Sequence, residues 1–206
     1  MFPLESVRLP GEDLPLRIFE PRYQALVREC LSGDRQFGVV LISAGREVGG
    51  ADARLDVGVM ARIVEAQDQG GGLYRIDCAM TDRIRVVEWL PDDPFPRATT
   101  EPWPDEPGRA VGGAEIADVE DQVMALFERV AEAQGATLPP KRDLLGEPEP
   151  GQDAGERLYA LASRIPIGQA DRYALLAAPS AEKRLDALRD AVETVAALVE
   201  FQLAED

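Results

Sequence analysis

The sequence of 206 residues contains no histidine and only two cysteines, Cys30 and Cys78. Catalytic triads that depend on an imidazole are therefore excluded, because no histidine can take the proton of a nucleophile. Two cysteines without CxxC spacing are too few for a disulfide scaffold, a redox pair or a four-ligand zinc site. We expect both thiols to be reduced core residues, and we expect neither a metal ion nor another cofactor.

Lysine is also scarce, since Lys141 and Lys183 are the only two in the chain. Neither lies beside a glycine-flanked serine, so a serine–lysine dyad has no support. Acidic pairs such as Asp92-Asp93 lie in proline-rich segments without an aromatic sugar platform, which favours solvated acids over glycosidase chemistry. The glycines at 70 to 72 are not followed by the GK[ST] of a phosphate-binding loop. The sequence therefore predicts a protein that is not an enzyme.

Long apolar runs and positive charge are missing as well. No run approaches the roughly 18 uninterrupted apolar residues of a membrane helix, and the start of the chain is unlike a secretory leader, so we expect a cytoplasmic protein. The net charge of −16 argues against binding to a nucleic-acid backbone. Residues 1–100 hold 12 arginines and 16 acids, net −4, and residues 101–206 hold 10 basic and 22 acidic residues, net −12. We interpret this acidity as a solvated surface, with a surface for cations or a basic partner as the alternative.

The stretch LPLRIFEPRYQALVREC, residues 14 to 30, changes from strand-like to helix-like patterning. Its apolar start is typical of an extended strand, in which Pro15 is tolerated at an edge. Pro21 suits the first position of a helix, whose apolar face recurs at three- and four-residue spacing until Ser32-Gly33. We interpret Glu20-Pro21-Arg22-Tyr23 as a strand-to-helix corner, because an acid and an arginine without an imidazole or metal ligand could bind but not catalyse.

Four further strands are predicted in the first half, and helices dominate the second. The strands cover residues 37–42, 57–64, 74–80 and 83–89, with a glycine hairpin loop at 70–72 and a short break after residue 80. Proline and glycine crowd residues 91–113, which can carry an edge strand but no helix and join two regions. Helices are expected from residue 115 to Gly135, at 155–166 and 169–178, and from the N-cap Ser180 onwards, with a loop at 141–153.

Several of these segments, in this order, resemble the Lon substrate-binding domain family. The likeness begins with LPLRIFEPRYQALVREC, continues through FGVVLI, VGVMARIVEA, DRIRVVEW and DPFPRATTE, and ends with ASRIPIGQADRYALLAAPSAEKRLDALRDAVE. It covers nearly the whole chain and is weakest between about residues 100 and 155. Thr81-Asp82 departs from the family, which commonly has a glycine before the arginine-led strand.

This resemblance implies an α+β fold with two parts. A PUA-like β pseudo-barrel with one inserted helix is expected at residues 1–108, followed by an α-helical bundle at residues 109–206. In full-length Lon proteases the corresponding region precedes an ATPase module and a serine–lysine peptidase module, and it helps to recognise unfolded or tagged substrates. Neither module fits in this sequence, so we expect a standalone, non-catalytic member.

The leading hypothesis is a module that binds unfolded or extended polypeptide through an apolar groove or an exposed sheet edge. Arg17, Phe19 and Arg22 are the candidate substrate contacts, and the alternative is that they only stabilise the corner. A second hypothesis is an adaptor that docks on a folded partner, or on itself, through the acidic helical half. A third is an unrecognised hydrolase. We expect no nucleic-acid or membrane partner, and the oligomeric state is left open.

Overall fold

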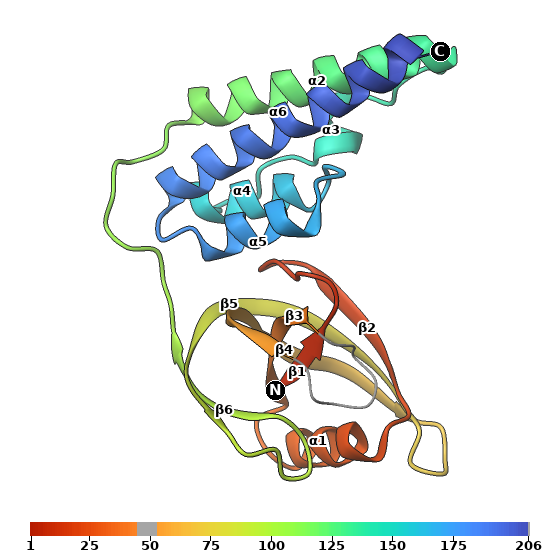
Figure 1. Cartoon of the computed structure of the whole chain (residues 1–206), viewed down its shortest axis with the longest axis vertical. Coiled ribbons are helices and arrows are strands. Elements are labelled where there is room, and N and C mark those ends of the chain that lie inside the picture. The colour runs from red at the N-terminus through yellow and green to blue at the C-terminus, as the bar shows by residue number, and fades with distance from the viewer. Residues whose placement is uncertain (45–52, 206) are drawn as a thin grey trace. The chain divides into compact units, whose positions relative to one another are not determined.

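The chain folds into two compact units, Met1–Pro104 and Asp105–Asp206, in a computed structural model that describes residues 1–44 and 53–205 (Figure 1). Over these residues the first unit holds a six-stranded sheet with one helix, and the second is helical. This arrangement confirms the predicted α+β class. The domain ranges 1–108 and 109–206 stay a prediction, and the residues just before that boundary bond to the helical unit: Asp105 accepts hydrogen bonds from Arg184 and Glu106 donates one to Pro179.

The sheet combines one parallel pair of strands with antiparallel pairs. Its strands are β1 (Phe2–Leu4), β2 (Asp13–Ile18), β3 (Gln36–Ala44), β4 (Ala53–Asp68), β5 (Tyr74–Leu90) and β6 (Arg97–Pro102). Their order is β1-β3-β4-β5-β2, with β6 also paired to β5, and β1 runs parallel to β3. The sequence pattern does not indicate β1, because three residues are too few to show an alternation.

The predicted break between residues 80 and 83 is wrong, because β5 continues through it as one strand of 17 residues. Opposite Met80 and Arg83, β4 offers Ala61 and Val59, so β5 carries one extra residue between these pairs. This is a β-bulge, which accommodates Thr81-Asp82 without ending the strand and lets the strand bend. Figure 1 shows β5 as a long curved strand.

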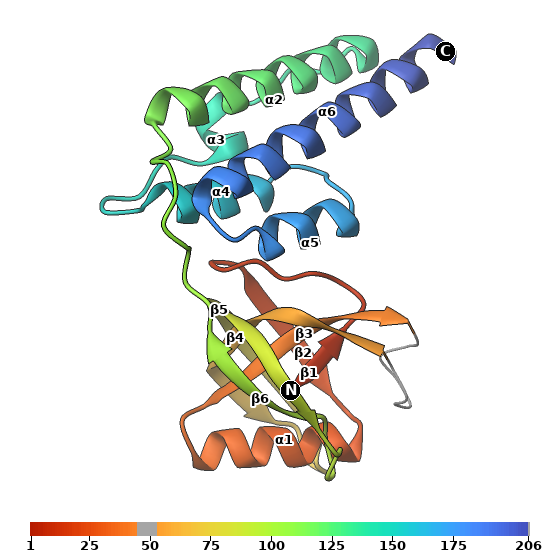
Figure 2. The same cartoon turned by 60° about the vertical axis from the view of Figure 1, so that its left-hand side comes forward.

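The corner helix α1 (Pro21–Ser32) has the limits predicted from the sequence. It lies across one end of the curled sheet in both views (Figure 2). Its buried face consists of Tyr23, Leu26, Val27 and Cys30, and the ring of Tyr23 stacks on Phe2 with centroids 4.2 Å apart. Apolar side chains from every second position of β4 and β5 complete this core.

The second unit consists of α2 (Gly113–Gln134), α3 (Lys141–Leu145), α4 (Ala154–Ala162), α5 (Gln169–Ala177) and α6 (Ala181–Glu205). The N-cap prediction for α6 is confirmed, because the backbone N–H of Lys183 donates to Ser180 Oγ at 3.3 Å. The loop predicted at 141–153 is wrong in its first part, where α3 forms. That short helix turns Leu145 into the core, where its exposure is 0%, and its five residues are too few for a periodic signal.

Two arginines are buried within the helical unit. Arg184 of α6 is 1% exposed, donates to Asp105 Oδ2 at 2.9 Å, and lies 3.9 Å above the ring of Tyr159. Gly155 makes room for this pair, since a Cβ there would lie 2.6 Å from Arg184 Nη1. Arg157 of α4 donates to the carbonyl of Gly146 at 3.0 Å and so fixes the end of α3.

We predict that Arg184→Met lowers the free energy of unfolding by about 3 kcal/mol, because it leaves Asp105 without its buried partner. Urea unfolding followed by circular dichroism measures the change. The control is Arg189→Met on the same helix, whose side chain is 32% exposed and lies 3.9 Å from Asp118. The control should cost less than about 0.5 kcal/mol, and an equal loss in both variants would contradict the structural role of Arg184.

The two cysteines are free and buried, as predicted. Burial raises the pKa of Cys30 to about 11 and that of Cys78 to about 12. We therefore expect Ellman's reagent to label the folded protein very slowly near neutral pH, where thiolate is scarce, and to label both thiols at once in denaturant. Cys30→Ser leaves Cys78 as the one reporter. Fast labelling of this folded variant would show that the first unit opens readily.

Candidate functional site

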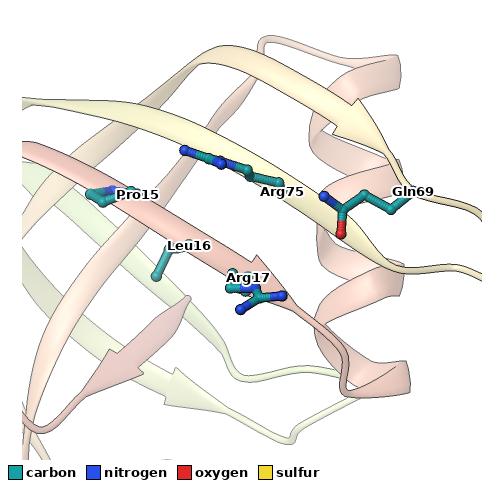
Figure 3. A pocket seen from close by; sticks show the side chains of 5 residues that line it. All are labelled: Pro15, Leu16, Arg17, Gln69 and Arg75. Atoms are coloured by element: carbon teal, nitrogen blue, oxygen red, sulfur yellow. The ribbon is translucent and has the colours of Figure 1, made fainter.

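A hollow of about 500 Å³ lies on the surface of the first unit, over β2 and β5 (Figure 3). Its surface is mostly apolar. It is lined by Pro15, Leu16, Arg17, Gln69 and Arg75. A mostly apolar hollow with a few polar groups at its edge is the usual form of a small recognition site.

The register of the sheet explains why residues so distant in sequence line one hollow. Arg17 of β2 lies directly opposite Arg75 of β5, and the two strands are antiparallel. Leu14 and Ile18 are buried, whereas Pro15 and Arg17 are exposed, so β2 turns alternate side chains to the core and to solvent. Gln69 joins the group because its backbone N–H donates to the carbonyl of Leu73 at 2.8 Å, which closes the hairpin beside β5.

The two arginines form an unusual pair, since like charges directly opposite each other on neighbouring strands repel. Within residues 1–44 and 53–205, neither guanidinium group forms an ion pair or a hydrogen bond. The carboxylates nearest in register, Asp77 and Glu65, lie one row further along the sheet, opposite Pro15 and Asp77 respectively. Glu65 accepts a hydrogen bond from Gln67 at 2.7 Å. The guanidinium groups at the hollow are therefore available to a ligand.

Two exposed apolar side chains lie next to the arginines along the strands. Phe19 is 59% exposed and Leu73 is 44% exposed, and they follow the last registered pair, Ile18 and Tyr74. They lie just beyond the two strands, since β2 ends at Ile18 and β5 begins at Tyr74, and each is two positions along the chain from an arginine of the hollow. The amide of Gln24 donates to the carbonyl of Phe19 at 2.9 Å and holds its backbone in place.

The three residues predicted as substrate contacts have different surroundings. Arg17 lines the hollow and Phe19 is exposed beside it. Arg22 instead pairs with Glu20, Nε to Oε2 at 3.0 Å, and lies 4.4 Å from the centre of the Tyr23 ring. These contacts agree with the structural interpretation of the corner.

Arg75, Leu73 and Gln69 were not among the residues singled out from the sequence. The alternation of Leu73 and Arg75 with Tyr74 and Ile76 marks those two as outward-facing, but many outward residues share that pattern, and Gln69 lies in the hairpin loop. What sets them apart is the pairing of β2 with β5, which joins positions almost 60 residues apart, for example Arg17 and Arg75. A local pattern carries no information on such a pairing.

β2 also offers a free edge. In the part of the chain that is described, β5 is its one strand partner. The backbone groups on the other side of an edge strand are available to an added strand. Pro15, which has no N–H to donate, is compatible with this edge position.

Both lysines are paired with carboxylates. A hydrogen bond to Asp121 raises the pKa of Lys141, and one to Asp186 raises the pKa of Lys183. A general base needs the opposite shift. Among the described residues, no three His, Cys, Asp or Glu side chains are grouped closely enough to hold a metal ion. The described helices include none with the length and apolar character needed to cross a membrane.

The first unit is a curled sheet with a surface hollow, and a helical unit follows it. The sequence matches the family described as the ATP-dependent protease La (LON) substrate-binding domain over residues 1–194. The chain therefore belongs to the Lon substrate-binding domain family, and the resemblance inferred from its motifs is confirmed. No curated protein matches the chain.

Two solved structures show the same fold. The Lon N-terminal domain protein from Xanthomonas campestris is 26% identical, with a TM-score of 0.60, and the alignment covers 92% of this chain and 95% of that one. The N-terminal domain of the Mycobacterium avium complex Lon protease is 15% identical, with a TM-score of 0.58 and coverage of 92% and 94%. Both share the Lon N-terminal domain fold with this chain.

The repulsion between Arg17 and Arg75 leads to a prediction about stability. We expect Arg75→Gln to raise the free energy of unfolding by about 0.5 kcal/mol, because it removes one of two opposed like charges. The gain should shrink at high salt, which screens exposed charges. The matched control is Arg62→Gln, an exposed arginine opposite Ala79 and Gln36, which should change little. A clear loss of stability in Arg75→Gln alone would show that Arg75 is a structural residue.

Proposed function

We propose that the chain is a non-catalytic module that captures unfolded or extended polypeptide at the hollow beside β2. The observation that carries the proposal is the coincidence of three features at β2: a free backbone edge, the mostly apolar hollow of about 500 Å³, and the exposed ring of Phe19 just after the strand. An added strand would bond its backbone to β2, and its side chains would occupy the hollow. Arg17 and Phe19 would contact the bound chain, and Arg22 would hold the corner that positions Phe19.

Membership of the Lon substrate-binding family supports the same role. The absence of histidine from the sequence, and the raised pKa of both lysines, support a chain that leaves peptide cleavage to another protein. The net charge of −16 supports partners other than nucleic acids or acidic membrane surfaces. The two free, buried cysteines are in keeping with a cytoplasmic location.

A second candidate function is docking on a folded partner through the helical unit. It rests on Leu198 and Phe201 of α6, which are 56% and 62% exposed. Their spacing of three residues places them on one helical face. An exposed apolar pair of this kind marks a possible contact surface without defining what covers it.

One experiment separates the two candidates. We expect labelled β-casein, an unfolded polypeptide, to bind in fluorescence anisotropy, and Phe19→Ser to weaken binding at least tenfold, because a buried aromatic ring contributes about 1.5–3 kcal/mol. Val87→Ser is the matched control, since Val87 is 61% exposed on β5. The casein should remain intact on a gel, with or without ATP.

The outcomes are distinct. Loss of binding in Phe201→Ser, with Phe19→Ser unaffected, would assign recognition to α6 and overturn the proposed site. Absence of any binding to β-casein would contradict the function itself. Cleavage of the casein would identify the chain as a hydrolase.

A further inference from the structure

The electrostatics of the hollow define its ligand more narrowly than apolar surface alone. Arg17 and Arg75 are both exposed and face each other across the β2–β5 ladder. Their Cβ atoms are therefore about 5 Å apart, and a single carboxylate can accept hydrogen bonds from both guanidinium groups. In the described part of the chain no carboxylate pairs with either one.

The apolar pair lies at a fixed offset from the charged pair. Phe19 follows Arg17 by two positions, and Leu73 precedes Arg75 by two, so both lie one residue beyond the last registered pair, Ile18 and Tyr74. A polypeptide added along the edge of β2 would turn every second side chain to this face. Two such side chains, about 7 Å apart, would meet the arginines and the Phe19–Leu73 pair respectively.

We infer that the hollow selects extended segments in which a glutamate or aspartate stands two residues from a large apolar side chain. The acid would pair with Arg17 and Arg75, and the apolar side chain would pack on Phe19 and Leu73. The inference rests on the proposed function and adds the class of segment that is held. A side-chain carboxylate is the occupant, because contact with Phe19 and Leu73 requires a further residue beyond the acid.

The negative net charge of the chain makes a preference for acidic peptides informative about the local site. At −16 the protein repels acidic peptides in general. A preference for an acidic peptide therefore cannot arise from the overall field and must come from a local cationic site. At physiological salt, charges further than about 8 Å from the hollow are largely screened, so the local field is set by the two arginines against Asp77, which lies one row away opposite Pro15.

The test uses short peptides that are acetylated and amidated at their ends, so that no terminal charge interferes. Each contains leucine and, two positions away, glutamate, glutamine or lysine, in a background of serine and threonine. We expect the glutamate peptide to bind about tenfold more tightly than the glutamine peptide. Moving leucine and glutamate to adjacent positions should remove most of this advantage, because adjacent side chains face opposite sides of a strand.

The arginine variants assign the preference to the site. In Arg75→Gln the ratio of affinities between the glutamate and glutamine peptides should fall to about one, and in Arg62→Gln it should keep its full value. High salt should also reduce the ratio in the unmodified protein. Arg62→Gln is the suitable control because Arg62 is exposed on β4, away from the hollow, and the substitution removes the same charge.

Failure of the inference and failure of the proposed function give different results. Equal, measurable binding of the glutamate and glutamine peptides would overturn the acid preference and leave polypeptide capture standing. No binding of these peptides or of β-casein would overturn both. A glutamine peptide with a free C-terminal carboxylate that matches the amidated glutamate peptide would also overturn the inference, because the hollow would then bind chain ends.

Discussion

The pairing of β5 with three other strands is the constraint on which the first unit depends. β4 pairs along one edge of β5, while β2 and β6 share the other edge in succession, at Tyr74–Ala79 and Ile84–Leu90. One extra residue near Thr81-Asp82 separates these two stretches and bends the strand. Without this bend one strand could not carry both partners around a curled sheet. The same pairing places Arg75 opposite Arg17, so the hollow is a direct product of how the sheet closes.

Each unit has its own arginine contacts to the segment of chain that connects the two units. Arg83 donates to the carbonyl of Trp103 at 2.9 Å, and Arg83 and Arg85 lie 4.1 and 3.8 Å from the centre of its ring. Two residues later, Asp105 is held by Arg184 of the helical unit. Trp103 is therefore held by an arginine of the first unit and Asp105 by an arginine of the second. Hydrogen bonds from a guanidinium group fix the position of their acceptors more closely than apolar packing does.

The sequence predicts elements well where local rules decide, and poorly where long-range pairing decides. Pro21 and Gly33 bound α1 because proline and glycine act on their own backbone. Thr81-Asp82 suggests a break, since a polar pair interrupts the alternation, yet neighbouring strands absorb it as a bulge. The residues of the candidate site also fall into these two groups. Arg17 and Phe19 are found from the corner motif, but Arg75 enters only through a register that no local pattern contains.

Like charges placed directly opposite each other oppose folding, and a surface selected for stability alone would not retain them. Folding can tolerate them here because both side chains reach water, where repulsion is weak. A bound carboxylate reverses the sign of the interaction and brings the ligand into register with β2. Backbone bonds to an edge strand are indifferent to sequence, so a strand-adding site needs side-chain contacts to fix position. The opposed arginines supply charge at one step of the strand and the Phe19–Leu73 pair supplies apolar surface at the next, and together they give an otherwise uniform edge a preferred alignment.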